Sequence, residues 1–173
     1  MKNIIISLLL ILGTNVHAIT VEGNSKYKVQ VNKCLKLLSV NAKSEYKLIK
    51  EHIGIIKQSN KSGMKAWENP PLYLMSDTTA FYSVSWCAST IAHDAYHSYL
   101  YQKHMPSNGK KTPYNKWGGF KSERQAISYQ LKVMKKIGSS NHEINYLKTL
   151  DGTHGDVNKD GKLDTTDYKQ RNW

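Results

Sequence analysis

The chain has 173 residues, 39% of them hydrophobic, and a formal net charge of +12. This length suits one domain with one sizeable core. The lysines are spread along the chain and the aromatic residues form no RNA-binding signature, so the sequence does not indicate specific nucleic-acid binding; the charge suits a solvated surface that favours anionic cell-surface polymers.

Residues 1–18 have the pattern of a secretory signal peptide. Lys2 gives a basic start, Ile4 to Leu12 form an apolar run, and Ala18 completes an A-x-A-like cleavage position. The run is too short to span a membrane comfortably, and no later stretch could do so. We therefore expect cleavage after Ala18 and a secreted or periplasmic protein without a transmembrane segment. An uncleaved anchor is the alternative.

The spacing of apolar residues predicts one long helix over residues 27–58. Apolar side chains recur every three or four positions from Val31 to Ile56, while Lys and Glu occupy the other faces. Turn-forming residues at 59–63 end this helix. Its apolar stripe is expected to pack against the rest of the domain.

Residues 64–83 change character and predict a small antiparallel sheet. Met64–Trp67 and Leu72–Met75 are strand-like, and the two prolines between them exclude a helix there. Residues 76–79 predict a turn, and residues 80–83 predict a further extended segment.

Residues 84–104 predict a second helix, because apolar residues recur at helical spacing and neither proline nor glycine interrupts the stretch. This helix carries His93 and His97. Positions i and i+4 of a helix lie on the same face, so the two imidazoles could bind one metal ion. The aromatic loop at 110–120 would form either the wall of a cleft or ordinary packing over the core edge.

Two more helices are expected after this loop. The first runs from Lys121 to Ile137, with Ser122 as a candidate cap and Gly138 at its end. The second covers Glu143–Leu150. The predicted fold class is therefore α+β and mainly helical, with one domain over residues 19–150.

A catalytic zinc ion uses three protein ligands and one water. Glu123, 26 residues after His97, is the candidate third ligand. Ala126 lies one turn after it, and a small residue there would let the two helices approach closely. His104 also follows His97, but the helix continues through this region, so His104 is expected at the surface.

The sequence His93-Asp94-x-x-His97 with a later Glu123 resembles the gluzincin zinc metallopeptidases, whose helix carries HExxH. The resemblance covers roughly residues 27–150 in the order of parts: long helix, small sheet, His helix and Glu helix. It implies that His93, His97 and Glu123 hold zinc, and that Asp94 is the general base in place of the usual Glu. Asp is shorter by one methylene and reaches less far.

Other features of the implied reaction have weaker candidates. Tyr129 and His154 could donate a hydrogen bond to an oxyanion. The strand-like residues 72–75 could align an extended peptide by strand addition. A His-Asp pair also occurs in HD-domain phosphohydrolases, but the chain lacks the further His and Asp residues on other helices that they need.

Cys34 falls on the first predicted helix and Cys87 near the start of the His helix. An exported protein can form a disulfide, which would connect these two helices. Two buried thiols that never meet are the alternative, and the sequence leaves both possibilities open.

Residues 156–167 match the calcium loop of an EF-hand. Gly161 takes loop position 6, where the chain must turn sharply, and Leu163 points inward. Oxygen donors occupy positions 1, 3, 5, 7, 9 and 12, and position 7 contributes a backbone carbonyl: Asp156, Asn158, Asp160, Lys162, Asp164 and Asp167.

The loop also resembles one repeat of a dockerin, including Asp at position 12. Dockerins need two such repeats, so a single structural calcium site that fixes residues 151–173 to the same domain is favoured. The alternative is a solvated turn without an ion.

The sequence therefore predicts a secreted zinc-dependent hydrolase that cleaves peptide or related amide bonds, with zinc and calcium as cofactors. Its partners would be a peptide or protein substrate and an anionic cell-surface polymer. Two alternatives remain open: a non-catalytic secreted binding or adhesion module that keeps the fold, and a calcium-dependent interaction module of dockerin type.

Overall fold

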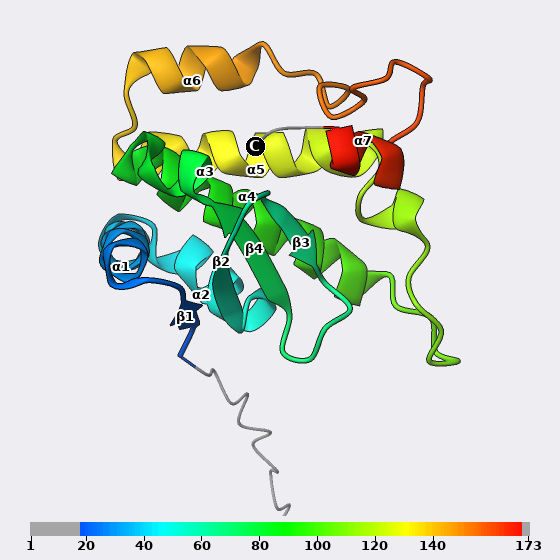
Figure 1. Ribbon diagram of the computed structural model, residues 1–173, viewed down its shortest axis with the longest axis horizontal. Helices are drawn as coiled ribbons and strands as arrows, with labels where there is room; N and C mark the ends of the chain where they lie inside the picture. Colours follow the sequence, from blue (N-terminus) through cyan, green and yellow to red (C-terminus); the bar gives the residue numbers. More distant parts are fainter. Residues whose placement is uncertain (1–17, 171–173) are drawn as a thin grey trace, which may run out of the picture.

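The computed structural model describes residues 18–170 (Figure 1). The predicted signal peptide lies outside the described residues, except for Ala18. The chain forms, in order, β1 (Thr20–Glu22), α1 (Ser25–Asn41), α2 (Lys43–His52), β2 (Ile55–Ser59), β3 (Gly63–Lys65), β4 (Leu72–Ser76), α3 (Asp77–Tyr82), α4 (Val84–Lys103), the 3₁₀ turn η1 (Tyr114–Lys116), α5 (Phe120–Ile137), α6 (Asn141–Lys148) and α7 (Thr165–Gln170).

The predicted class, α+β and mainly helical, is confirmed, but the sheet is mixed rather than antiparallel. Its strand order is β1-β2-β4-β3. β2 runs parallel to both β1 and β4, and β3 alone is antiparallel to its neighbour β4. The reason is the connection through α1 and α2, which returns the chain to the sheet in the direction of β1. β3 is consequently an edge strand, and β4 is an inner strand.

The prediction of one helix over residues 27–58 is wrong. The helical path breaks at Ala42, and α2 ends before Ile53, which is extended (φ −131°, ψ 120°). The following residues Ile55 and Ile56 pair with Leu72 and Tyr73 of β4. The β-branched isoleucines suit a strand, and this long-range pairing overrides a spacing that also fits a helix.

Residues 76–83 also differ from the prediction. Instead of a turn and an extended segment, they form the short helix α3. Ser76 caps this helix by accepting a hydrogen bond from the Thr79 backbone N–H, and Ser83 caps α4 in the same way from the Trp86 N–H. The chain therefore enters α4 directly from one helix, with its first turn fixed by a cap.

Helix α4, predicted at 84–104, is confirmed and lies at the centre of the molecule. In Figure 1 the sheet lies against α4 on one side and α5 runs along its other side, with α6 beyond α5. The buried face of α4 is rich in small residues, including Ala88, Ala92 and Ala95, which let neighbouring helices approach closely. No helix within residues 18–170 is long and apolar enough to cross a membrane.

Cys34 of α1 and Cys87 of α4 are joined by a disulfide, with their Cα atoms 5.9 Å apart. Of the two possibilities that the sequence left open, the structure has the bridge. It ties the first helix of the chain to the central one.

Helix α5 starts one residue earlier than predicted, and its start differs in one respect. Gly119, rather than Ser122, is the residue at the N-cap, while Ser122 lies buried inside the first turn. Gly138 ends the helix in the left-handed conformation (φ 71°), as its position predicted. α6 begins at Asn141, two residues before the predicted Glu143, because Ser140 and Glu143 form a capping box.

Candidate metal centre

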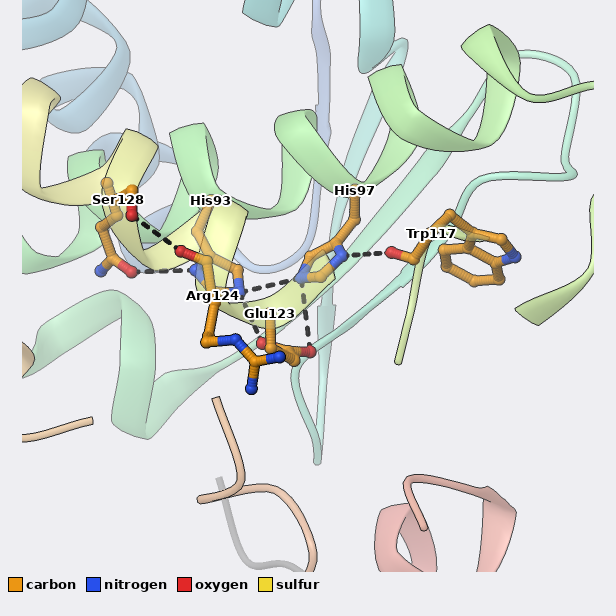
Figure 2. Close-up of polar contacts among 7 residues, drawn as sticks. His93, His97, Trp117, Glu123, Arg124 and Ser128 are labelled. Carbon is orange, nitrogen blue, oxygen red and sulfur yellow. Dashed lines mark hydrogen bonds and ion pairs between the residues drawn. The ribbon is translucent and has the colours of Figure 1, made fainter. Parts of the chain in front are cut away.

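The two histidines of α4 point the same way. His93 Nε2 and His97 Nε2 lie 3.0 Å apart, and both rings face α5 (Figure 2). The side chain of His97 is 6% exposed and that of His93 is 16% exposed. The i, i+4 spacing therefore places two imidazole nitrogens at one point near the surface, as the sequence predicted.

Glu123 of α5 completes the group. Its two carboxylate oxygens lie 3.3 Å from His93 Nε2 and 3.4 Å from His97 Nε2. Among residues 18–170, His93, His97 and Glu123 form the group of His, Cys, Asp or Glu ligand atoms that lie within 4.8 Å of one another. The sequence prediction of Glu123 as the third member is thus matched by its position. This group could hold a metal ion.

A chain of hydrogen bonds fixes the tautomer of His93. The hydroxyl of the fully buried Ser89 donates to the Trp86 carbonyl, so its oxygen accepts from Gln130 Nε2 at 3.1 Å. This orientation turns Gln130 Oε1 toward His93 Nδ1 at 3.0 Å. Because Oε1 can only accept, Nδ1 carries the proton and Nε2 keeps its lone pair for a metal.

His97 is oriented in the same way by a different group. Its Nδ1 lies 2.5 Å from the backbone carbonyl of Trp117, which can only accept a hydrogen bond. Nδ1 therefore carries the proton here too, and the lone pair of neutral His97 is on Nε2. Both imidazoles present Nε2, the nitrogen that could bind a metal, toward Glu123, and each has the second hydrogen bond that is usual for a metal-bound histidine.

The charges of the group are coupled. Burial lowers the pKa of His97, but the Glu123 carboxylate outweighs this effect and raises the pKa to about 9. Burial likewise opposes ionisation of Glu123, but His97 and His93 hold the pKa of this carboxyl well below its usual range. Without a metal, a proton shared between His97 and Glu123 therefore stabilises the site, close to the position that a cation would take.

Asp94, the predicted base, lies outside the three-ligand group. It is half-buried and faces β4: burial raises the pKa of the Tyr73 phenol well above its usual value, and the nearby Asp94 carboxylate raises it further. The charge of Asp94 also raises the pKa of His97, although its effect is smaller than that of Glu123. Asp94 therefore lies close enough to the group to influence its charge.

The remaining histidine and tyrosine candidates do not join the group. His104 is the exposed C-cap of α4, in agreement with its predicted surface position. Tyr129 lies on a different face of α5 and stacks on Tyr96 with ring centroids 4.9 Å apart. His154 follows α6, in a segment whose Gly152 packs against the first turn of α5.

Sequence reasoning missed the residues that orient the histidines. Gln130 could have been identified from its spacing, because it lies seven residues, or two helical turns, after Glu123 and thus on the same face of the helix. The sequence could not indicate Trp117, because this residue acts through its backbone carbonyl, which every residue possesses.

The loop at 156–167 turns where predicted, with Gly161 in the left-handed conformation (φ 80°). Asp156 accepts from the N–H groups of Asp160 and Gly161, and the buried Asp167 accepts from Val157 and Asp164. Within the described residues, however, no three carboxylates of this loop approach one another as closely as the ligands of the His–His–Glu group do. Its carboxylates instead hold the loop's own backbone.

Comparisons of the chain with models of protein families, with curated proteins and with solved structures found no match. The fold and the three-residue group therefore define this protein as an α+β domain with a candidate metal centre.

Proposed function

We propose that this protein is a zinc-dependent hydrolase that cleaves peptide or related amide bonds. The observation that supports the proposal is the convergence of His93 Nε2, His97 Nε2 and a Glu123 oxygen, with both Nδ1 atoms bonded to fixed acceptors. Two imidazoles and one carboxylate are a ligand set of catalytic zinc, which keeps a fourth position open.

Zinc in this position would activate a water molecule and polarise a scissile carbonyl. The residues around it would divide the remaining tasks. Gln130 and the Trp117 carbonyl hold the imidazoles in orientation. Asp94 is the proposed general base, because it is the nearby carboxylate that is not a member of the ligand group; it would accept a proton from the attacking water and pass it to the leaving amine. Burial keeps the Tyr73 phenol beside it neutral.

An extended peptide would be aligned by β3 rather than by β4. The sequence pointed to residues 72–75 as a pairing edge, but these residues belong to β4, which pairs with β2 and β3 on its two sides. β3 is an edge strand of the sheet and contacts α4, the helix that carries the histidines. A substrate strand added to β3 would therefore run along the sheet edge on the side of α4.

The test starts with metal content. Residues 19–173 are loaded with zinc, dialysed and analysed for metal, beside His93→Ala/His97→Ala. The matched control is His104→Ala/His142→Ala, which removes two exposed histidines. We expect about one zinc per chain in the wild type and in the control, and none in the site variant. Equal zinc in all three proteins would refute the site.

Hydrolysis is tested on a library of labelled peptides, with Asp94→Ala as the comparison. Cleavage that requires zinc, His93 and Asp94 supports the proposed enzyme. Stoichiometric zinc without cleavage of any peptide would instead favour a secreted binding module that keeps the metal but not the reaction.

We also propose that calcium binds the loop at 156–167. Its support is the match of donor types and positions to an EF-hand loop, including the turn at Gly161. The Lys61 ammonium donates to the backbone carbonyls of Tyr168 and Lys169, so the end of α7 is attached to the turn between β2 and β3. This attachment suits a structural ion better than a freely presented dockerin surface. Calorimetric titration with calcium, beside Asp156→Asn/Asp160→Asn, tests it: heat of binding in the variant equal to that of the wild type would refute this site.

A further inference from the structure

A second surface feature lies on α5, away from the metal centre. It is a shallow groove of about 430 Å³, lined by Tyr96, Lys121, Arg124, Gln125, Ser128, Tyr129 and Lys132. None of the three metal-group residues lines it. Residues 121, 125, 128 and 132 recur every three or four positions, which places them on the side of α5 opposite to Glu123 and Gln130. The groove is thus separate from the candidate metal centre.

The lining of the groove is cationic. Helix α5 contains five Lys or Arg residues and a single acidic residue, Glu123, which is turned toward the histidines. Lys132 is paired with Glu45 at 2.9 Å. Among the described residues, the side chains of Lys121 and Arg124 have no carboxylate partner, and both are exposed. This end of the groove therefore offers two positive charges to a ligand.

The groove is long enough for a polymer. Lys121 and Lys132 are eleven residues apart, so its line along the helix extends roughly 16 Å at 1.5 Å per residue. Between the cations lie the neutral hydrogen-bonding groups of Gln125 and Ser128. A ligand that matches this alternation carries both anionic groups and hydroxyls along an extended chain.

The two tyrosines favour sugars over nucleic-acid bases. Tyr96 and Tyr129 are stacked at an angle of 26°, so each ring covers one face of the other. The Lys132 ammonium lies 6.0 Å from the Tyr129 ring centre. Base recognition by single-strand binders relies on open aromatic faces, whereas the hydroxyls of this pair can form hydrogen bonds to a sugar.

We propose that this groove binds an acidic polysaccharide, with Lys121 and Arg124 on its anionic groups and the polar and tyrosine side chains on its hydroxyls. The site does not depend on the proposed hydrolase activity. It would hold the protein on an acidic glycan surface while the metal centre faces elsewhere.

The experiment measures fluorescence anisotropy of labelled oligomers at physiological ionic strength, with the full mature chain. The probes are fragments of polygalacturonate, which carries carboxylates, and of dextran sulfate. Neutral dextran and a single-stranded oligonucleotide of equal charge are the comparisons. The test variant is Lys121→Gln/Arg124→Gln, and the matched control is Lys33→Gln/Lys36→Gln, which removes the same charge from exposed positions of α1. Circular dichroism and thermal melting confirm that each variant folds.

We expect at least one acidic polysaccharide to bind more tightly than the oligonucleotide, and the groove variant to bind it about tenfold more weakly, while the control changes by less than about twofold. The probe that binds more tightly, polygalacturonate or dextran sulfate, identifies carboxylate or sulfate as the preferred anionic group. Equal losses in both variants would show attraction to the general positive charge and overturn the proposal. Tighter binding of the oligonucleotide, or no binding of either polysaccharide, would overturn it as well.

Discussion

The orientation of His93 by Gln130 gives the sharpest test of the candidate metal centre. Gln130→Met keeps the length of the side chain and removes the acceptor for His93 Nδ1–H, which lies 3.0 Å away in the wild type. The three proposed ligands are unchanged. Because Gln130 is 3% exposed, water cannot readily replace its oxygen. His93 then loses the partner that fixes its tautomer and rotation.

The expected size of the effect follows from the role of such partners. Loss of the second hydrogen bond of a metal-bound histidine lowers metal affinity by between about 10- and 100-fold, which corresponds to about 1.4 to 2.8 kcal/mol. The cost to folding should be smaller, since the Ser89 hydroxyl still donates to the Trp86 carbonyl. Gln130→Glu should retain most of the affinity, because a carboxylate also accepts from Nδ1–H and the Ser89 hydroxyl can rotate to donate to it.

The assay is competition for zinc with a chromophoric chelator at fixed pH. Gln125→Met, an exposed change on the same helix, is the matched control and should leave the affinity within about twofold of the wild type. Unchanged affinity in Gln130→Met, or an equal loss in the Gln125 control, would refute the assignment of Gln130. Retained folding is checked by thermal melting.

Four further predictions concern pH and covalent structure. The raised pKa of His97, about 9, means that protons compete with the metal: zinc affinity measured by competition should fall as the pH is lowered from 9, and an affinity independent of pH over this range would contradict the shared proton. In the metal-free protein, the interaction of His97 with Glu123 stabilises the fold below pH 6.5, and we expect this contribution to be lost as the pH rises through 9. The measurement is the free energy of urea unfolding of the wild type and of Glu123→Gln across this pH range. The pKa of Glu45 falls to about 2 despite burial, because two lysines of α5 bond to it. The contribution of this carboxylate to the free energy of unfolding is present above pH 4.5 and is lost as the pH falls through 2. Glu45→Gln should lower the free energy of unfolding by about 2 kcal/mol at neutral pH, which is less than the full pKa shift implies because the lysines are exposed. Reduction of Cys34–Cys87, which are 53 residues apart, should lower the free energy of unfolding by about 2–4 kcal/mol, and an equal stability with and without reductant would contradict this.

The helices of the site could be predicted because their patterns allow one reading. Helix α4 begins at the Ser83 cap, has an interior without proline or glycine and is followed by Pro106, and α5 combines an apolar stripe with a glycine at its end. Their local sequences agree with the tertiary fold, so the positions of His93, His97 and Glu123 on facing helices followed from spacing and one small residue, Ala126.

The sheet could not be predicted in the same way, because its arrangement depends on distant partners. Ile49, Ile53 and Ile56 satisfy helical spacing, and only the pairing of β2 with β4 decides that the chain is extended from Ile53 onward. Strand direction likewise follows from the path of α1 and α2 across the molecule. Neither the extended conformation after Ile53 nor the strand direction is encoded in a short window of the sequence. This is why the predictions of a long helix and of an antiparallel sheet were both wrong.

The arrangement of the histidines indicates a site that is formed before any metal binds. Each imidazole is held by a group from outside α4: Gln130 from α5, and the Trp117 carbonyl from the segment between η1 and α5. α4 itself is held against α1 by the disulfide and packs against α5. A site whose ligands are ordered by the surrounding fold loses little conformational entropy on binding, so zinc should bind here without a change in secondary structure. The same rigidity limits how far Asp94 can move, and the proposed reaction therefore depends on where the carboxylate already lies.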